Sequence, residues 1–147
     1  MSRFPWWDTT LTIYNKYEDP QTRVITWYST VIENCFWKDV GNNVILNDVS
    51  LDTNTLLARI PKDARFIEKY QWVDLPADAK AAHFTLGVGD LIIKGEVSDA
   101  VNEYVSGHRS SDLIQKYKAL QGCMIIDKYG NNTGPGRCQQ HYLVTGK

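Results

Sequence analysis

Histidines and cysteines are the first residues to consider for chemistry, because imidazoles and thiols bind metals and act as bases or nucleophiles. His83 and His108 are isolated, and no HExxH spacing occurs. Cys123, Cys138 and His141 lie within one C-terminal segment and could together offer three soft ligands. A fourth ligand and a zinc-ligand spacing are missing, so we expect ordinary strand residues with free thiols and no metal.

Nucleophile and phosphate-loop motifs are also incomplete. The run Gly87-Val88-Gly89 resembles the start of a phosphate loop, but the GxGxxG pattern fails at Ile92. Ser110 and Ser111 lack a surrounding GxSxG elbow, and their position favours capping of a helix. The aspartates are scattered among segments rich in turn formers. We therefore expect no enzymatic activity, no catalytic residue and no cofactor.

Tryptophan is the unusual residue type, with five in the chain. A stacking platform for single-stranded nucleic acid would interleave such rings with cations, yet the sequence neighbours of Trp27 and Trp37 include only Arg23 and Lys38. Core packing or protein contact is favoured instead. Trp6 and Trp7 belong to a terminal segment, where a neighbouring subunit would cover them. The predicted subunit-interface residues are Trp6, Trp7, Trp27 and Trp37.

Composition indicates one folded domain over residues 1–147. Hydrophobic residues make up 43% and charged residues 22%, near the averages of globular domains. The formal net charge of -1 gives no general attraction to nucleic acid or anionic lipid. No apolar run reaches the roughly 20 residues of a membrane span, and residues 1–8 lack the order of a signal peptide. We expect a protein kept in a cytosol-like compartment without membrane contact.

Hydrophobic periodicity predicts mostly strands. Residues 9–15 and 24–33 alternate as two strands of a hairpin, residues 34–40 extend as a third segment, and residues 55–61 form a short strand closed by a proline. Residues 66–73 fit either a strand or a loop, and residues 75–82 are polar. After a glycine-rich turn comes a buried strand around residues 91–93.

The C-terminal half adds two predicted helices, 99–105 and 110–120, the second ending at Gly122. In that helix Leu113, Ile114, Tyr117 and Leu120 form one apolar face. Two strands within 124–129 and 138–145 follow. The order predicts a β-rich α+β domain, either a small antiparallel β-barrel or a sandwich, with one main helix packed against it.

Three segments are candidates for contacts: a flexible N-terminal arm (1–8) and two long polar loops at 41–54 and 130–137. From these and the polar stretch after the short strand we predict residues that line a DNA channel or dock on an adjoining ring. They are Asn42, Asn43, Asn47, Lys62, Arg65, Lys69, Asn131, Asn132 and Arg137.

Three blocks of the sequence resemble a family of small structural proteins of tailed bacteriophages, found in prophages of Gram-positive bacteria. The first is TLTIYNKYED (10–19) with TWYSTVIENCFWKD (26–39), and the second is FTLGVGDLIIKGEVSDAVNEY (84–104). The third is MIIDKYGNNTGPGRCQQHYLVTGK (124–147), where His141, Val144, Gly146 and Lys147 match the family ending. Tyr142 stands where tryptophan is usual, and residues 50–75 match poorly.

The resemblance implies a head-tail connector or stopper, a head-closure protein of the phage neck that lies in the virion after assembly in the host cytoplasm. Its expected partners are further copies of itself in a hexameric or dodecameric ring, portal or adaptor proteins above, a tail terminator or tail tube protein below, and packaged double-stranded DNA held by non-specific contact. Which polar loop faces the DNA stays open. The alternatives are a tail-completion or terminator protein, a capsid accessory protein, and a single-stranded nucleic-acid-binding barrel.

Overall fold

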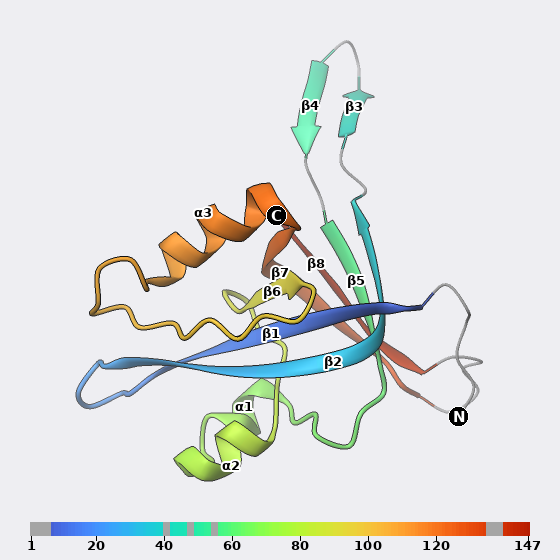
Figure 1. Cartoon of the computed structure of the whole chain (residues 1–147). Coiled ribbons are helices and arrows are strands. Elements are labelled where there is room, and N and C mark those ends of the chain that lie inside the picture. Colours follow the sequence, from blue (N-terminus) through green and yellow to red (C-terminus); the bar gives the residue numbers. More distant parts are fainter. Residues whose placement is uncertain (1–6, 40–41, 47–48, 54–55, 135–139) are drawn as a thin grey trace.

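Six antiparallel strands close into a barrel in the order β1-β2-β5-β8-β7-β6 (Figure 1). The computed structural model describes residues 7–39, 42–46, 49–53, 56–134 and 140–147. The barrel strands are β1 (Thr9–Glu18), β2 (Ile25–Asp39), β5 (Leu56–Pro61), β6 (Leu91–Lys94), β7 (Cys123–Asn132) and β8 (His141–Gly146). The remaining elements are β3 (Asn42–Leu46), β4 (Val49–Thr53), α1 (Lys69–Trp72), α2 (Ala77–Ala82) and α3 (Ser110–Leu120). This confirms the predicted β-rich fold and decides for the barrel over the sandwich.

Strand β1 is buried on both faces, and this divides the core in two. Leu11 and Ile13 point into the barrel, where they pack with residues of β2, β5, β7 and β8. Tyr14 belongs to a second cluster, between the outer wall of the barrel and α3, to which Leu113 and Tyr117 contribute. Thr12 lies on the same outer wall and is also fully buried. The helix predicted to pack on the sheet therefore does so along β1, the adjacent β6 and β7 on the far side of β6.

Strands β3 and β4 pair with each other as a separate two-stranded sheet. Residues 41–54 were expected to form a loop, so the paired strands correct that prediction. The two strands also contain aliphatic and β-branched residues, which favour strands: Val44, Ile45 and Leu46 in β3, and Val49, Leu51 and Thr53 in β4. Figure 1 draws this hairpin beyond the end of the barrel where β2 finishes and β5 begins.

Five further local predictions differ from the structure. Residues 69–72 and 77–82 are helical rather than strand, loop or irregular. The helix predicted at 99–105 is absent, because the Asn102 side chain accepts a hydrogen bond from the Tyr104 amide (2.9 Å) and competes with helical pairing. The cap of α3 is Arg109, not a serine; its amide donates to Asp112 Oδ2 at 3.2 Å. Residues 130–132, expected in a hairpin tip, continue β7.

Among the described residues, none of the helices combines the length and the apolar character that crossing a bilayer requires.

Candidate functional site

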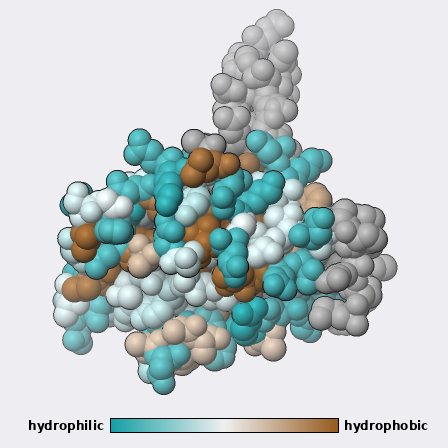
Figure 2. Space-filling view, viewed as in Figure 1, coloured by the Kyte–Doolittle hydropathy of each residue, from teal (hydrophilic) through white to brown (hydrophobic). Residues whose placement is uncertain are grey.

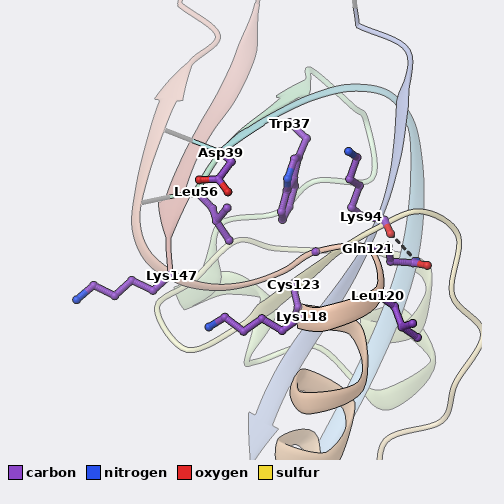
Figure 3. A pocket seen from close by; sticks show the side chains of 10 residues that line it. Trp37, Asp39, Leu56, Lys94, Lys118, Leu120, Gln121, Cys123 and Lys147 are labelled. Carbon is purple, nitrogen blue, oxygen red and sulfur yellow. Dashed lines mark hydrogen bonds between the residues drawn. The ribbon is translucent and has the colours of Figure 1, made fainter. Parts of the chain in front are cut away.

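A cleft of about 770 Å³ opens at the end of the barrel where β2 finishes and β5 begins. Its residues come from four strands, one helix and the segments after α3 and β8, most of them at the point where an element ends or begins. Barrel closure places these ends together although they are far apart in sequence. The lining residues are Trp37, Asp39, Leu56, Lys94, Lys118, Leu120, Gln121, Gly122, Cys123 and Lys147 (Figure 3). We refer to this feature as the basic cleft.

Gly122 shapes the wall of the basic cleft, between α3 and β7. Its φ of 116° is rarely adopted by residues with a side chain, and a Cβ atom there would lie 3.2 Å from Trp37 Cζ2. Lys94 donates its amide hydrogen to the Gly122 carbonyl (3.0 Å), and Gln121 Nε2 donates to the Lys94 carbonyl (2.6 Å). These two bonds tie the end of β6 to the end of α3. The indole of Trp37 therefore faces a backbone held at a fixed position.

Three lysines give the basic cleft its positive charge. Lys94, Lys118 and Lys147 are all exposed, and their ammonium groups form no hydrogen bond or ion pair with any described residue. Asp39 is the one carboxylate side chain among the lining residues, and it has an interaction partner of its own. The lining side chains therefore carry a formal charge of three minus one, or +2. An anionic group is the natural complement of this arrangement.

The cysteine in the cleft is not a reactive thiol. Cys123 is buried, and burial raises its pKa to about 11, with the charge of Lys118 opposing the shift. Burial likewise raises the pKa of Cys35 to about 12. Both stay protonated and weakly nucleophilic near neutral pH. No group of three or more potential metal ligands occurs in the part of the chain that the structure describes, and Cys138 lies outside that part.

The predicted interface tryptophans lie in different environments. Trp37 lines the basic cleft, whereas Trp27 is half-buried against the outer core cluster beneath α3. Trp7 is buried within its own subunit, with its ring 5.6 Å from that of His141 in an edge-to-face arrangement. Trp7 is therefore already covered within its own subunit, while the interface role of these tryptophans and the flexible arm over residues 1–8 stay predictions. Trp6 lies outside the described residues.

The predicted channel or docking cations do not meet in the basic cleft. Arg65 forms an ion pair with Asp63 (2.8 Å), and Lys69 forms one with Asp90 (3.1 Å). Lys62 is exposed just after β5. Two of the three cations are therefore already neutralised by carboxylates within the subunit.

The predicted asparagines are dispersed. Asn42 and Asn43 belong to β3, and Asn132 is the last residue of β7. Asn131 contacts Glu68 at 3.4 Å from its side-chain amide. Asn47 and Arg137 lie outside the described residues.

The lysines of the basic cleft were missed by sequence reasoning. Lys94 ends β6, Lys118 lies in the last turn of α3 and Lys147 follows β8. They are separated by more than twenty residues from one another and match no spacing rule. Only the closed barrel brings them around Trp37, so no sequence signal was available to identify them.

The glycine-rich segment 87–89 has a structural role. Asp90, next to it, is buried and accepts hydrogen bonds from the amides of Gly87 and Lys16, both at 3.0 Å, and from Asn15 Nδ2 at 3.0 Å. Lys69 Nζ completes the set. Burial raises the pKa of the Asp90 carboxyl group, while the Lys69 charge and the hydrogen bonds oppose the shift. The segment therefore attaches the loop between α2 and β6 to β1, which is a structural role and not phosphate binding.

Together these observations define a small closed β-barrel with one packed helix, a separate β-hairpin and a basic cleft at one end. The chain belongs to DUF6751, a family of unknown function, whose model matches residues 6–147. No curated protein and no solved structure matches the chain.

Proposed function

We propose that the protein is a non-enzymatic structural component of a phage virion, a ring-forming subunit of the neck that closes the portal channel, retains DNA and presents a docking surface to the tail. The three-block resemblance supports the virion assignment, since its segments cover β1 and β2, the Asp90 segment with β6, and β7 with β8. In this fold those segments contain five of the six barrel strands. The resemblance thus concerns the framework of the domain.

The hairpin β3–β4 is the observation that carries the proposal. A hairpin of two strands is only marginally stable in water, and each strand has an edge of unpaired backbone groups. Strands of five residues that pair only with each other therefore gain most from a partner surface. A neighbouring ring subunit, the adjoining ring or DNA in the channel would each supply one.

Ring formation also agrees with the architecture. The six strands close into a barrel, and unpaired backbone remains where one strand extends past its neighbour, as in the part of β2 before Phe36, which pairs with β1 alone. On the face shown in Figure 2, hydrophobic atoms form separated patches among hydrophilic ones, and one patch lies where Figure 1 places the C-terminal end of α3. Repeated head-to-tail contacts between different surfaces of one subunit close into a ring if the rotation closes.

Electron microscopy of virions labelled at the N-terminus of this subunit tests the proposal. Label confined to the joint between head and tail is the expected result, and averaging of that joint then gives the copy number, six or twelve. Label over the capsid shell would support the capsid accessory alternative, and label on the tail would support a tail-completion or terminator protein. Absence of the protein from purified virions would refute the virion assignment itself.

A further inference from the structure

We propose that the basic cleft binds the nucleotide unit of a single-stranded nucleic acid, with a base against the indole of Trp37 and phosphate groups on the three cleft lysines. The inference does not rest on the neck assignment. It identifies a binding site and a ligand chemistry within the barrel, whichever assembly the barrel joins.

Trp37 provides the planar surface. Its ring stands inside the cleft, with the Lys94 side chain beside it (Figure 3). The register places it opposite Ala58, which has the smallest side chain on that stretch of β5, and against Gly122, which has no side chain. A base stacked on an aromatic ring contributes substantially to binding and places no requirement on the sequence.

The cleft lysines provide the complement to phosphate. Lys69, Lys80 and Lys116 are each held by other groups: Lys69 and Lys116 pair with carboxylates, and Lys80 lies over the rings of Tyr17 and Trp72. Lys94, Lys118 and Lys147 have no such partner among the described residues. Three unpaired cations around one cleft repel one another, and an anion in the cleft relieves that repulsion.

The tertiary structure thus reverses the sequence argument against this ligand. Near Trp37 in the sequence the one cation is Lys38, which is too little for a stacking platform. In the folded chain, Trp37 shares a cleft with three lysines from β6, α3 and the segment after β8. Aromatic surface interleaved with cations is the arrangement that binds single strands.

The volume and the lining agree with a nucleotide. A space of about 770 Å³ lies within the range of small-ligand sites, and its open side allows a strand to enter and leave. Leu120 is 69% exposed at the rim and Leu56 is half-buried, so apolar surface is available for the sugar and base. Lys118 lies in the last turn of α3, where its charge also interacts favourably with the partial negative charge of the helix end.

An acidic segment of another protein is the competing occupant, and the lysines argue against it. Protein interfaces are depleted in lysine relative to the remaining surface, whereas lysine is a regular phosphate contact. The experiment below separates the two.

Fluorescence anisotropy of a labelled 20-nucleotide oligo(dT) with the purified chain, over a series of salt concentrations, tests the proposal. Binding that weakens with salt is expected. The variant Lys94→Gln/Lys118→Gln/Lys147→Gln should lower the steepness of the plot of log affinity against log salt by about 2, which corresponds to three lost phosphate contacts on a single strand. Trp37→Leu should weaken binding roughly ten-fold or more, and Trp37→Phe should restore most of it.

A matched variant controls for overall charge. Arg23, Lys16 and Lys128 are exposed cations outside the cleft, so Arg23→Gln/Lys16→Gln/Lys128→Gln removes the same charge and should leave binding close to that of the unchanged chain. Near-ultraviolet circular dichroism verifies that each variant is folded. If Trp37→Leu unfolds, the variant with the three cleft lysines replaced still tests the proposal, because those side chains are exposed.

Three results would overturn the inference. The first is no binding of the oligonucleotide at 50 mM salt, and the second is an equal loss of oligonucleotide binding in the cleft and control variants. The third is that the cleft substitutions abolish self-association of a chain that binds no oligonucleotide. Competition with thymidine monophosphate distinguishes the source of the ligand chemistry. Displacement at concentrations of the mononucleotide similar to those of the oligonucleotide would assign the cleft to a free nucleotide and overturn the single-strand assignment. Displacement only at far higher mononucleotide concentrations supports a strand.

Discussion

Gly146 is the residue on which closure of the barrel depends most directly. It lies opposite Leu56 on β5 and Ile126 on β7, and a Cβ atom there would overlap the Ile125 carbonyl oxygen and lie 2.6 Å from Met124 Cγ. The glycine at position 146, which matches the family ending, thus has a steric reason.

We predict that Gly146→Ala lowers the free energy of unfolding by about 3 kcal/mol or more, because backbone on two strands must move to admit one methyl group. Urea denaturation followed by tryptophan fluorescence measures the change. Gly130→Ala is the matched control, since a Cβ atom at Gly130 on β7 meets nothing within 4 Å. Equal stability of the two variants would contradict this account of closure.

Asp90 is surrounded by donors alone. Oδ1 accepts from the Lys16 amide, Oδ2 accepts from the Gly87 amide and Asn15, and Lys69 contacts both oxygens. An asparagine would direct its own NH₂ group at two of these donors in one orientation and at three in the other. We therefore expect Asp90→Asn to cost about 1–3 kcal/mol in urea denaturation.

Asp74→Asn is the control for Asp90. Asp74 is exposed and forms no side-chain hydrogen bond with a described residue. Its substitution should leave the unfolding midpoint unchanged, and a loss as large as that of Asp90→Asn would show that the donor cage is not the cause.

The pH dependence of stability should include a contribution from Asp99. The Lys116 ammonium group, followed by the Tyr117 hydroxyl, lowers the pKa of the Asp99 carboxyl group below its usual 3.8. Since the folded-state pKa is the lower one, the ionised form stabilises the fold above pH 3.8 and loses this effect as the pH falls through the folded-state pKa.

The stability difference between the unchanged chain and Asp99→Asn should therefore be present at pH 7 and shrink below pH 3.8. Chemical denaturation at several pH values measures it, with Asp74→Asn again as the control. A difference that stays constant down to pH 2.5 would exclude ionisation of Asp99 as the source.

Among the elements, the β3–β4 hairpin is the one the barrel can lose. Asp39 at the end of β2 pairs directly with Leu56 at the start of β5. Replacing residues 40–55 with Asn-Gly would therefore join the two strands by a two-residue turn of the kind such hairpins favour.

We expect this shortened chain to fold with unchanged or higher stability, because a shorter loop loses less entropy on closure, and to lose ring assembly. Thermal denaturation measures the first property. Mass photometry, together with incorporation into virions, measures the second. Assembly that survives the replacement would exclude the hairpin as the interface and remove the main support for the neck proposal.

At the scale of the whole molecule, the barrel is one cooperative unit closed by its last strand. β8 pairs with both β5 and β7 and contributes Tyr142 and Val144 to the barrel core. A chain that ends at residue 134 would expose two strand edges and part of the core. We predict that it loses its near-ultraviolet circular dichroism and its cooperative thermal transition, while a retained sharp transition would show that the barrel folds without β8.

The sequence by itself determined the elements with local patterns. Alternation in the first two strands predicted the β1–β2 hairpin, and apolar spacing with Gly122 predicted α3 at its observed bounds. The class of fold followed from the order of these elements. Local prediction was wrong at residues 41–54 and 99–105. Asparagine in these segments is compatible with a turn, with a hairpin or with a side-chain hydrogen bond that competes with helical pairing, and only the pairing of distant residues selects among them.

The tertiary structure alone decided the candidate site. Trp7 packs on His141 because closing the barrel brings the segment before β1 beside β8. Lys69, expected to face DNA, is neutralised by a carboxylate twenty-one residues away. The cleft lysines come from three elements that local periodicity treats as independent, and they surround Trp37 only because the strands close on one another. A pattern in sequence reports the face of one element, whereas a site requires the relative placement of several.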